Sequence, residues 1–178
     1  MKLSEYSLSD IEEINTLFIK TFSDSEGKEE GDIIGNLTND LMTNTGSNDL
    51  YCFVATERDK IIAGVFFSRL TFESKIEAFM LSPMATLTEY QGKGVGQKLI
   101  NFGHNTLKEN GVRVVVTYGD INFYSKVGYK QITEDVIKAP LAMSMPEGWL
   151  GQSLISDKLE AIEDKPSCVK EFNKPEMW

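Results

Sequence analysis

The residues best suited to do chemistry lie at Gln91–Gly96, where three glycines alternate with other residues directly before an amphipathic pattern. The first turn of a helix has unpaired backbone N–H groups, and the helix macrodipole places a partial charge of about +0.5 there. Glycine has no Cβ, so a bulky anion can approach these amides directly. A glycine-rich turn that enters a helix therefore predicts an anion site, with a turn that holds no ligand as the alternative.

Two common phosphate motifs do not match this turn. The P-loop requires G-x-x-x-x-G-K-[ST], and this spacing does not occur in the chain. The dinucleotide fingerprint G-x-G-x-x-G fails from Gly92, because its third glycine falls on Gln97, and from Gly94, because it falls on Leu99. The pattern present is Q-x-x-G-x-G, so a nucleotide-binding module is disfavoured.

A second motif is the stretch "GDINFYSKVGY" at 119–129. Asp120 is a suitable N-cap and Gly128 a suitable stop, which predicts a short helix between them. Tyr124 precedes the pair Gly128-Tyr129 by four positions. A tyrosine has a pKa near 10 and can take part in proton transfer, and packing in the core is the alternative role for Tyr124.

The two motifs together resemble the GNAT (GCN5-related) N-acetyltransferases. "EYQGKGVGQKLI", preceded by "LSPMATL", is similar to the family's coenzyme A pyrophosphate loop, [RQ]-x-x-G-x-[GA], between the fourth strand and the third helix. The second motif follows after one helix and one strand, as in the family, and is most similar to the YhbS-like acetyltransferases. The resemblance is strongest over 80–130. It predicts a GNAT acetyltransferase domain at 1–155 and a C-terminal extension at 156–178.

The resemblance implies an α+β, single-domain GNAT fold. Its mixed, mostly antiparallel sheet has six to seven strands flanked by about four helices, with a splay between strands 4 and 5. It implies acetyl-CoA as acyl donor, without a metal. The amides of 92–96 and the Gln91 side chain would bind the pyrophosphate, and backbone groups of 84–86 would pair with pantetheine. The expected cofactor-binding residues are Met84, Ala85, Thr86, Gln91, Gly92, Lys93, Gly94, Val95 and Gly96. A merely solvated Lys93 is the alternative for that residue.

The resemblance assigns proton transfer only in part. Tyr124 matches the family position of the general acid near the CoA sulfur. Glu77 is a weak candidate for the base, and water-relayed deprotonation or capture of the neutral amine is equally compatible. His104, the single histidine, is expected to be a surface or packing residue. The absence of a clear base leaves a CoA-binding sensor or interaction protein without turnover as the alternative function.

The expected acceptor is a small-molecule or peptide amine. In this family the loop between the first two helices often lines the acceptor site, and here it is rich in acids, which favours a cationic amine; an ordinary solvated loop is the alternative. The acids are Asp24, Glu26, Glu29, Glu30 and Asp32.

The elements that must position these residues follow from hydrophobic periodicity. A helix over 7–22 is predicted to start with a capping box of Ser9 and Glu12 and to be followed by a polar loop and a weaker helix. Pro83 predicts a bulge or an edge in the fourth strand. The expected segments are strand 2–6, loop 23–32, helix 33–42, a hairpin over 50–72, strand 75–87, helix 95–110, strand 112–118, a helix from 121 to 127, and strands 129–133 and 141–145.

Composition excludes several function classes. The net charge is −9 and no Lys/Arg cluster is present, so no nucleic-acid partner is expected. No apolar run is long enough to span a membrane, and the N-terminus has no apolar signal core, so no membrane association is expected. Cys52 and Cys168 lie far apart and are interpreted as reduced thiols of a cytoplasmic protein. A homodimer is a further expectation, by analogy with relatives.

Overall fold

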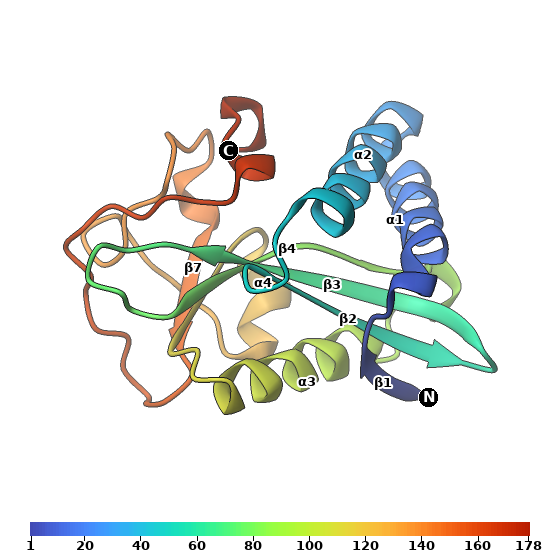
Figure 1. The fold of residues 1–178 in the computed structure, drawn as a ribbon, viewed down its shortest axis with the longest axis horizontal. Helices are drawn as coiled ribbons and strands as arrows, with labels where there is room; N and C mark the ends of the chain where they lie inside the picture. The colour runs from blue at the N-terminus through green and yellow to red at the C-terminus, as the bar shows by residue number, and fades with distance from the viewer. The chain divides into compact units, whose positions relative to one another are not determined.

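The computed structural model describes all residues from 1 to 178, which form two compact units. The first unit comprises Met1–Phe67 and Pro83–Gly103, and the second comprises Ser68–Ser82 and His104–Trp178. The strand order is β1-β2-β3-β4-β5-β7-β6, which together with four α-helices confirms the predicted α+β class and mixed sheet (Figure 1). The strands are β1 Lys2–Glu5, β2 Leu50–Glu57, β3 Lys60–Leu70, β4 Ala78–Thr86, β5 Val114–Tyr118, β6 Lys130–Gln131 and β7 Trp149–Ser153. The α-helices are α1 Ile11–Glu26, α2 Lys28–Asn44, α3 Val95–Glu109 and α4 Ile121–Tyr124.

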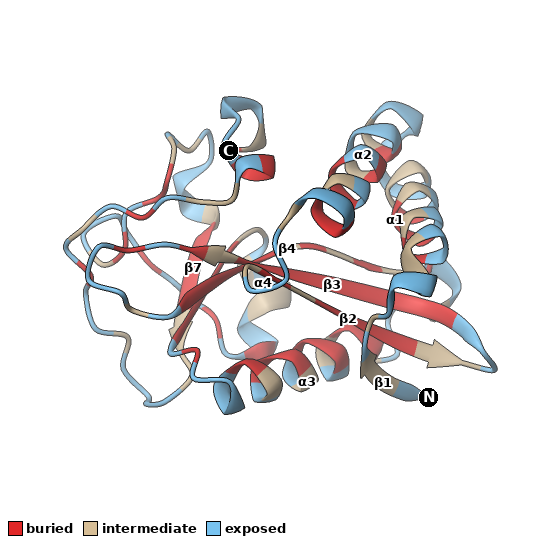
Figure 2. Cartoon of the chain, viewed as in Figure 1, coloured by how far each residue is buried: buried red, intermediate tan, exposed pale blue.

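In the first unit, helices cover both faces of the strands. Phe18 of α1 packs against Phe66 of β3, with ring centroids 5.3 Å apart. Phe67, the next residue of β3, points to the opposite face, as alternate residues of a strand must. There it meets Phe53 of β2, which in turn contacts Phe102 of α3. β3 is consequently buried along nearly its whole length (Figure 2).

The predicted polar loop after the first helix is wrong, because α1 continues to Glu26 and α2 begins at Lys28. Gly27 alone separates the two helices, with φ at +96°, a value that suits glycine. The acids of this stretch therefore lie on helices. Two of them form i,i+4 ion pairs that support the helices, Lys20–Asp24 at 2.7 Å and Lys28–Asp32 at 2.6 Å.

The start of the first helix also differs from the prediction. The capping box is formed by Ser7 and Asp10, not by Ser9 and Glu12, because a short 3-10 helix, Leu8–Asp10, precedes α1. The Ser7 N–H donates to Asp10 Oδ2 at 2.8 Å. The predicted hairpin is confirmed. Its two-residue turn places Arg58 and Asp59 at positive φ between β2 and β3.

In the second unit, β5 is central. It pairs in parallel with β4 from Ala78↔Val114 to Leu81↔Thr117 and antiparallel with β7. The strand predicted at 141–145 is wrong. That segment is irregular, and the strand that pairs with β5 and β6 is β7, which begins at Trp149 after a turn at Pro146–Gly148. Trp149 is fully buried, and its indole N–H donates to the Ile137 carbonyl at 2.8 Å.

The segment 156–178 contains only short 3-10 helices and isolated bridges, but it packs against other parts of the second unit. Ser167 bridges to Thr71, and Ile162 bridges to Ile137. Trp178 is buried, and its indole N–H donates to the Phe172 carbonyl at 2.8 Å. None of the helices has both the length and the apolar character that crossing a bilayer requires. The two cysteines are free thiols.

Candidate active site

The predicted anion loop connects β4 to α3 within the first unit. After β4 ends at Thr86, a 3-10 turn at Thr88–Tyr90 leads into the loop, and α3 starts at Val95. Gly92 and Gly94 have φ of +72° and +78°, and a Cβ built at either would meet nothing within 4 Å. Left-handed backbone costs other residues roughly 1–2 kcal/mol. The glycines are therefore required by the backbone conformation, and they also leave open space beside the amides.

The amides of this loop are unpaired. The Gln91 N–H donates to the Thr88 carbonyl at 3.3 Å, and the next amide that donates to a backbone carbonyl is that of Lys98, bonded to Gly94 at 3.1 Å. The intervening amides of 92–97 include the first turn of α3, whose N–H groups have no partner within the helix. Together with the macrodipole of a helix of 15 residues, they form a binding surface for an anion such as a diphosphate.

Side chains fasten the loop to its surroundings. Gln91 Nε2 donates to the Thr86 carbonyl at 2.9 Å, so this side chain ties the loop to the end of β4. The Lys93 ammonium donates to the Glu89 carbonyl at 3.0 Å and lies 5.5 Å from the ring centre of Tyr90. Gln91 was expected to contact the pyrophosphate itself. In the structure its Nε2 donates to the strand, the contact with the pyrophosphate stays a prediction, and the ammonium of Lys93 adds positive charge at the loop.

The end of β4 has the predicted splay. Pairing with β5 stops at Leu81, four residues into β4, although β4 itself continues to Thr86. Pro83 lacks an N–H and lies just past the last paired residue, which agrees with the interrupted ladder predicted for it. The backbone of 84–86 therefore follows the point where the partner strand is lost.

Tyr124 is held in the second unit by α4 and its flanking residues. Asp120 caps α4, since its carboxylate accepts from the Asn122 N–H at 2.9 Å, as the sequence predicted. The Tyr124 ring packs against Gly119 so closely that a Cβ there would lie 2.8 Å from the ring. Burial raises the pKa of Tyr124 to about 12, although a hydrogen bond with Thr117 lowers it. The hydroxyl therefore keeps its proton at neutral pH.

Thr117 is a further candidate site residue, which the sequence did not reveal. Its hydroxyl donates to the Leu81 carbonyl at 2.8 Å, at the last paired position of β4 and β5, and it also hydrogen-bonds Tyr124. Thr117 thus connects the start of the splay to the candidate general acid. In sequence it is a β-branched residue inside a strand, with nothing to distinguish it from the buried valines before it.

His104 is a packing residue, as expected. It is buried, and its Nε2 lies 3.0 Å from the Tyr129 hydroxyl. Burial lowers the pKa of His104 to about 4, so the imidazole is neutral at pH 7. The Tyr129 ring also contacts that of Tyr124, with centroids 5.7 Å apart. The buried pair of His104 and Tyr129 therefore packs against the ring of the candidate acid.

Glu77 is not brought to Tyr124. It precedes β4, which begins at Ala78, and its carboxylate forms an ion pair with Arg69. The Arg113 N–H donates to the Glu77 carbonyl at 2.9 Å, which places Glu77 near the start of β5, whereas Tyr124 follows the end of that strand. The acids Asp24 and Asp32 are likewise engaged, each with a lysine of its own helix.

Known proteins with a similar sequence or fold are acetyltransferases by name. Residues 48–131 match the acetyltransferase (GNAT) domain. Among curated proteins, the uncharacterized N-acetyltransferase YjhQ of Escherichia coli K12 is 28% identical over 158 residues, covering 85% of this chain and 81% of YjhQ. The uncharacterized N-acetyltransferase YhbS of the same strain is 29% identical over 120 residues, covering 66% of each chain.

Solved structures show the same fold. The crystal structure of YhbS from Escherichia coli in complex with CoA has a TM-score of 0.79 at 22% identity and covers 97% of this chain and 92% of its own. A GNAT-family acetyltransferase from Brucella melitensis in complex with acetyl-CoA has a TM-score of 0.70 at 21% identity, covering 97% of both chains. The glycine loop and the β4–β5 splay thus lie in a chain that has the fold of these acetyltransferases and whose residues 48–131 match the GNAT acetyltransferase domain.

Proposed function

We propose that this protein transfers the acetyl group of acetyl-CoA to a primary amine by direct attack in a ternary complex. The observation that carries the proposal is the unpaired set of amides between Gln91 and Lys98, beside two glycines at positive φ. Such a loop fits a diphosphate, because fixed N–H groups and the helix dipole stabilise negative charge without side-chain reorganisation. Its place within the residues that match the GNAT domain favours the pyrophosphate of CoA over other anions.

The splayed end of β4 would orient the donor. Backbone groups of Met84, Ala85 and Thr86 lie past the last residue paired with β5, so they are suited to hydrogen-bond the amides of pantetheine. Gln91 contributes by holding the loop against the Thr86 carbonyl. Backbone donors at a fixed position cost little entropy when they bind, which favours a defined place for the thioester.

Tyr124 would supply the proton for the leaving group. The amine nitrogen attacks the thioester carbonyl carbon, the C–S bond breaks, and the departing thiolate takes the hydroxyl proton of Tyr124, which then regains a proton from solvent. A pKa of about 12 keeps that proton in place until negative charge develops on sulfur. The amine proton passes to solvent in this proposal, because Glu77 is paired with Arg69 at the other end of β5.

Calorimetry with CoA and acetyl-CoA tests the site. Gly94→Glu adds a negative charge beside the amides and should weaken CoA binding at least tenfold, equivalent to about 1.4 kcal/mol. Gly94→Ala is the matched control, because it imposes the same backbone strain without the charge, and its loss should be clearly smaller. Equal CoA affinity of the wild type and Gly94→Glu would refute the site.

A sensor without turnover remains the second candidate, because the predicted base Glu77 is paired with Arg69 and the imidazole of His104 is buried against Tyr129. Release of CoA thiol in the presence of a panel of primary amines distinguishes the two functions. Amine-dependent release supports the transferase. Tight CoA binding without release for any amine supports the sensor.

A further inference from the structure

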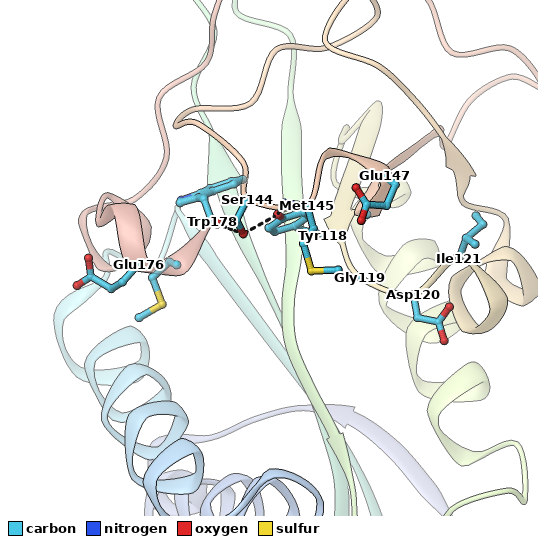
Figure 3. Close-up of a pocket in the computed structure, with 11 residues that line it drawn as sticks. Tyr118, Gly119, Asp120, Ile121, Ser144, Met145, Glu147, Glu176 and Trp178 are labelled. Carbon is cyan, nitrogen blue, oxygen red and sulfur yellow. Dashed lines mark hydrogen bonds between the residues drawn. The ribbon is translucent and has the colours of Figure 1, made fainter.

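A pocket of about 610 Å³ lies in the second unit, where β5 ends (Figure 3). Tyr118, the last residue of β5, forms part of its wall together with Met145 and Trp178. Met145 and Trp178 lie beyond the residues that match the GNAT domain, 48–131. The pocket is therefore built partly by residues outside the matched domain.

The aromatic wall of the pocket is held in place by hydrogen bonds. The Tyr118 and Trp178 rings are stacked, with centroids 6.0 Å apart and planes inclined by 20°. The Met145 N–H donates to the Tyr118 hydroxyl at 2.6 Å, and the Ser144 hydroxyl donates to the Trp178 carbonyl at 2.7 Å. The wall is thus preformed, and a flat apolar group can bind against it without first ordering these side chains.

The charged side chains that line the pocket are all carboxylates. Asp120, Glu147 and Glu176 come from three different segments, and no lysine, arginine or histidine lines the pocket. In the view of Figure 3, Glu176 lies on one side of the aromatic pair and Glu147 and Asp120 on the other. An aromatic wall between carboxylates is complementary to a ligand that combines a positive charge with an apolar body.

The pocket adjoins the candidate general acid. Gly119 lines the pocket, and the Tyr124 ring packs directly against the same glycine. The Gly119 N–H donates to the Gly148 carbonyl at 2.9 Å, which connects this strip of backbone to the loop that carries Glu147. A ligand in the pocket would therefore contact Gly119 on one side, while the Tyr124 ring packs against the same glycine.

We propose that this pocket binds the acceptor, and that the acceptor is a cationic amine bearing a flat apolar group rather than a hydrophilic polycation or a neutral amine. The apolar group would pack on Tyr118 and Trp178, and the carboxylates would attract the charge. The inference rests on the proposed transferase function, but ligand binding to the pocket can be measured without the cofactor.

Three probe ligands separate the contribution of the positive charge to binding from that of the aromatic ring. We would titrate 2-phenylethylamine, its neutral counterpart 2-phenylethanol and the ringless ethylamine into the full-length protein, and follow the indole N–H resonance of Trp178. The backbone N–H of Gly46, which lies in the first unit and does not line this pocket, is the internal reference. 2-Phenylethylamine should bind about tenfold more tightly than either other probe, because each of those lacks one of the two complementary features.

The variant Glu147→Gln/Glu176→Gln tests the charge. Both residues are exposed, so folding should be unaffected, and affinity for 2-phenylethylamine should fall about tenfold while that for 2-phenylethanol stays the same. Glu160→Gln, an exposed acid outside the pocket, is the control and should change neither. In turnover assays the double variant should raise KM for the amine tenfold and leave KM for acetyl-CoA unchanged.

The outcomes separate this inference from the proposed function. Equal affinity for the amine and the alcohol, equal affinity for ethylamine, or no effect of the double variant would overturn the acceptor assignment even where CoA binds normally. Failure of CoA to bind would overturn the transferase function, while the probe titrations would still decide whether the pocket recognises an aromatic cation.

Discussion

Lowering the pH should destabilise the protein through His104, and replacing this residue should remove that effect. His104 is buried, with its Nε2 3.0 Å from the Tyr129 hydroxyl, and burial lowers its pKa to about 4. In the unfolded chain a histidine has a pKa near 6.5. Between these values the unfolded state binds the extra proton and the folded state does not, so the free energy of unfolding must fall as the pH falls.

The size of the effect follows from the two pKa values. At pH 7 both states are largely deprotonated at this residue, and its contribution to the pH dependence is close to zero. By pH 5 most unfolded molecules carry the proton whereas most folded ones do not, which lowers the free energy of unfolding by about 2 kcal/mol. The loss approaches its limit of about 3 kcal/mol below pH 4, where the folded state also becomes protonated.

Urea denaturation of the wild type and of His104→Gln at pH 7 and pH 5 measures this contribution. Glutamine keeps a polar group near the Tyr129 hydroxyl but does not titrate, and the many carboxylates of the chain titrate alike in both proteins. The wild type should lose about 2 kcal/mol more than the variant between the two pH values. Equal losses would show that His104 is protonated in the folded protein and that burial does not control its charge.

Three further predictions concern the candidate site. Tyr124→Phe should lower kcat about 100-fold with little change in KM for acetyl-CoA. The kcat of the wild type should not decline between pH 7 and 10, because a hydroxyl with a pKa of about 12 keeps its proton in this range. A decline that is seen in the wild type and absent from the variant would contradict this pKa. Thr117→Val should lower the free energy of unfolding by about 1–2 kcal/mol in urea denaturation and reduce kcat several-fold. Thr117→Ser should leave both close to their wild-type values, because serine, unlike valine, keeps a hydroxyl that can donate to the Leu81 carbonyl. Gly92→Ala should lower the free energy of unfolding by roughly 1–2 kcal/mol through backbone strain alone. Gly46→Ala, at a glycine without positive φ, is the control and should change it by less than about 0.5 kcal/mol. Equal effects of the two variants in thermal unfolding would show that the conformation at Gly92 is not strained for alanine.

Local features of the sequence were sufficient for much of this architecture. Positive φ at Gly92 and Gly94, the cap at Asp120 and the stop at Gly128 each depend on a few neighbouring residues, so their signals are visible in the sequence. The order of strands and helices up to β5 also follows from periodicity. Where the local signal was ambiguous the prediction failed. The acids near Gly27 are as compatible with a loop as with helices, and the packing of α1 against α2 favours the helices.

The sequence by itself determined the type of site, a helix entered through a glycine turn and a tyrosine before a Gly-Tyr pair. Only the tertiary structure decided which groups act together. Thr117 reaches both Leu81 and Tyr124, Gln91 binds the Thr86 carbonyl, and Trp178 closes a pocket with Tyr118, 60 residues earlier in the chain. Such partners depend on which strands pair and where pairing stops, and that is set by long-range packing that no short stretch of sequence encodes.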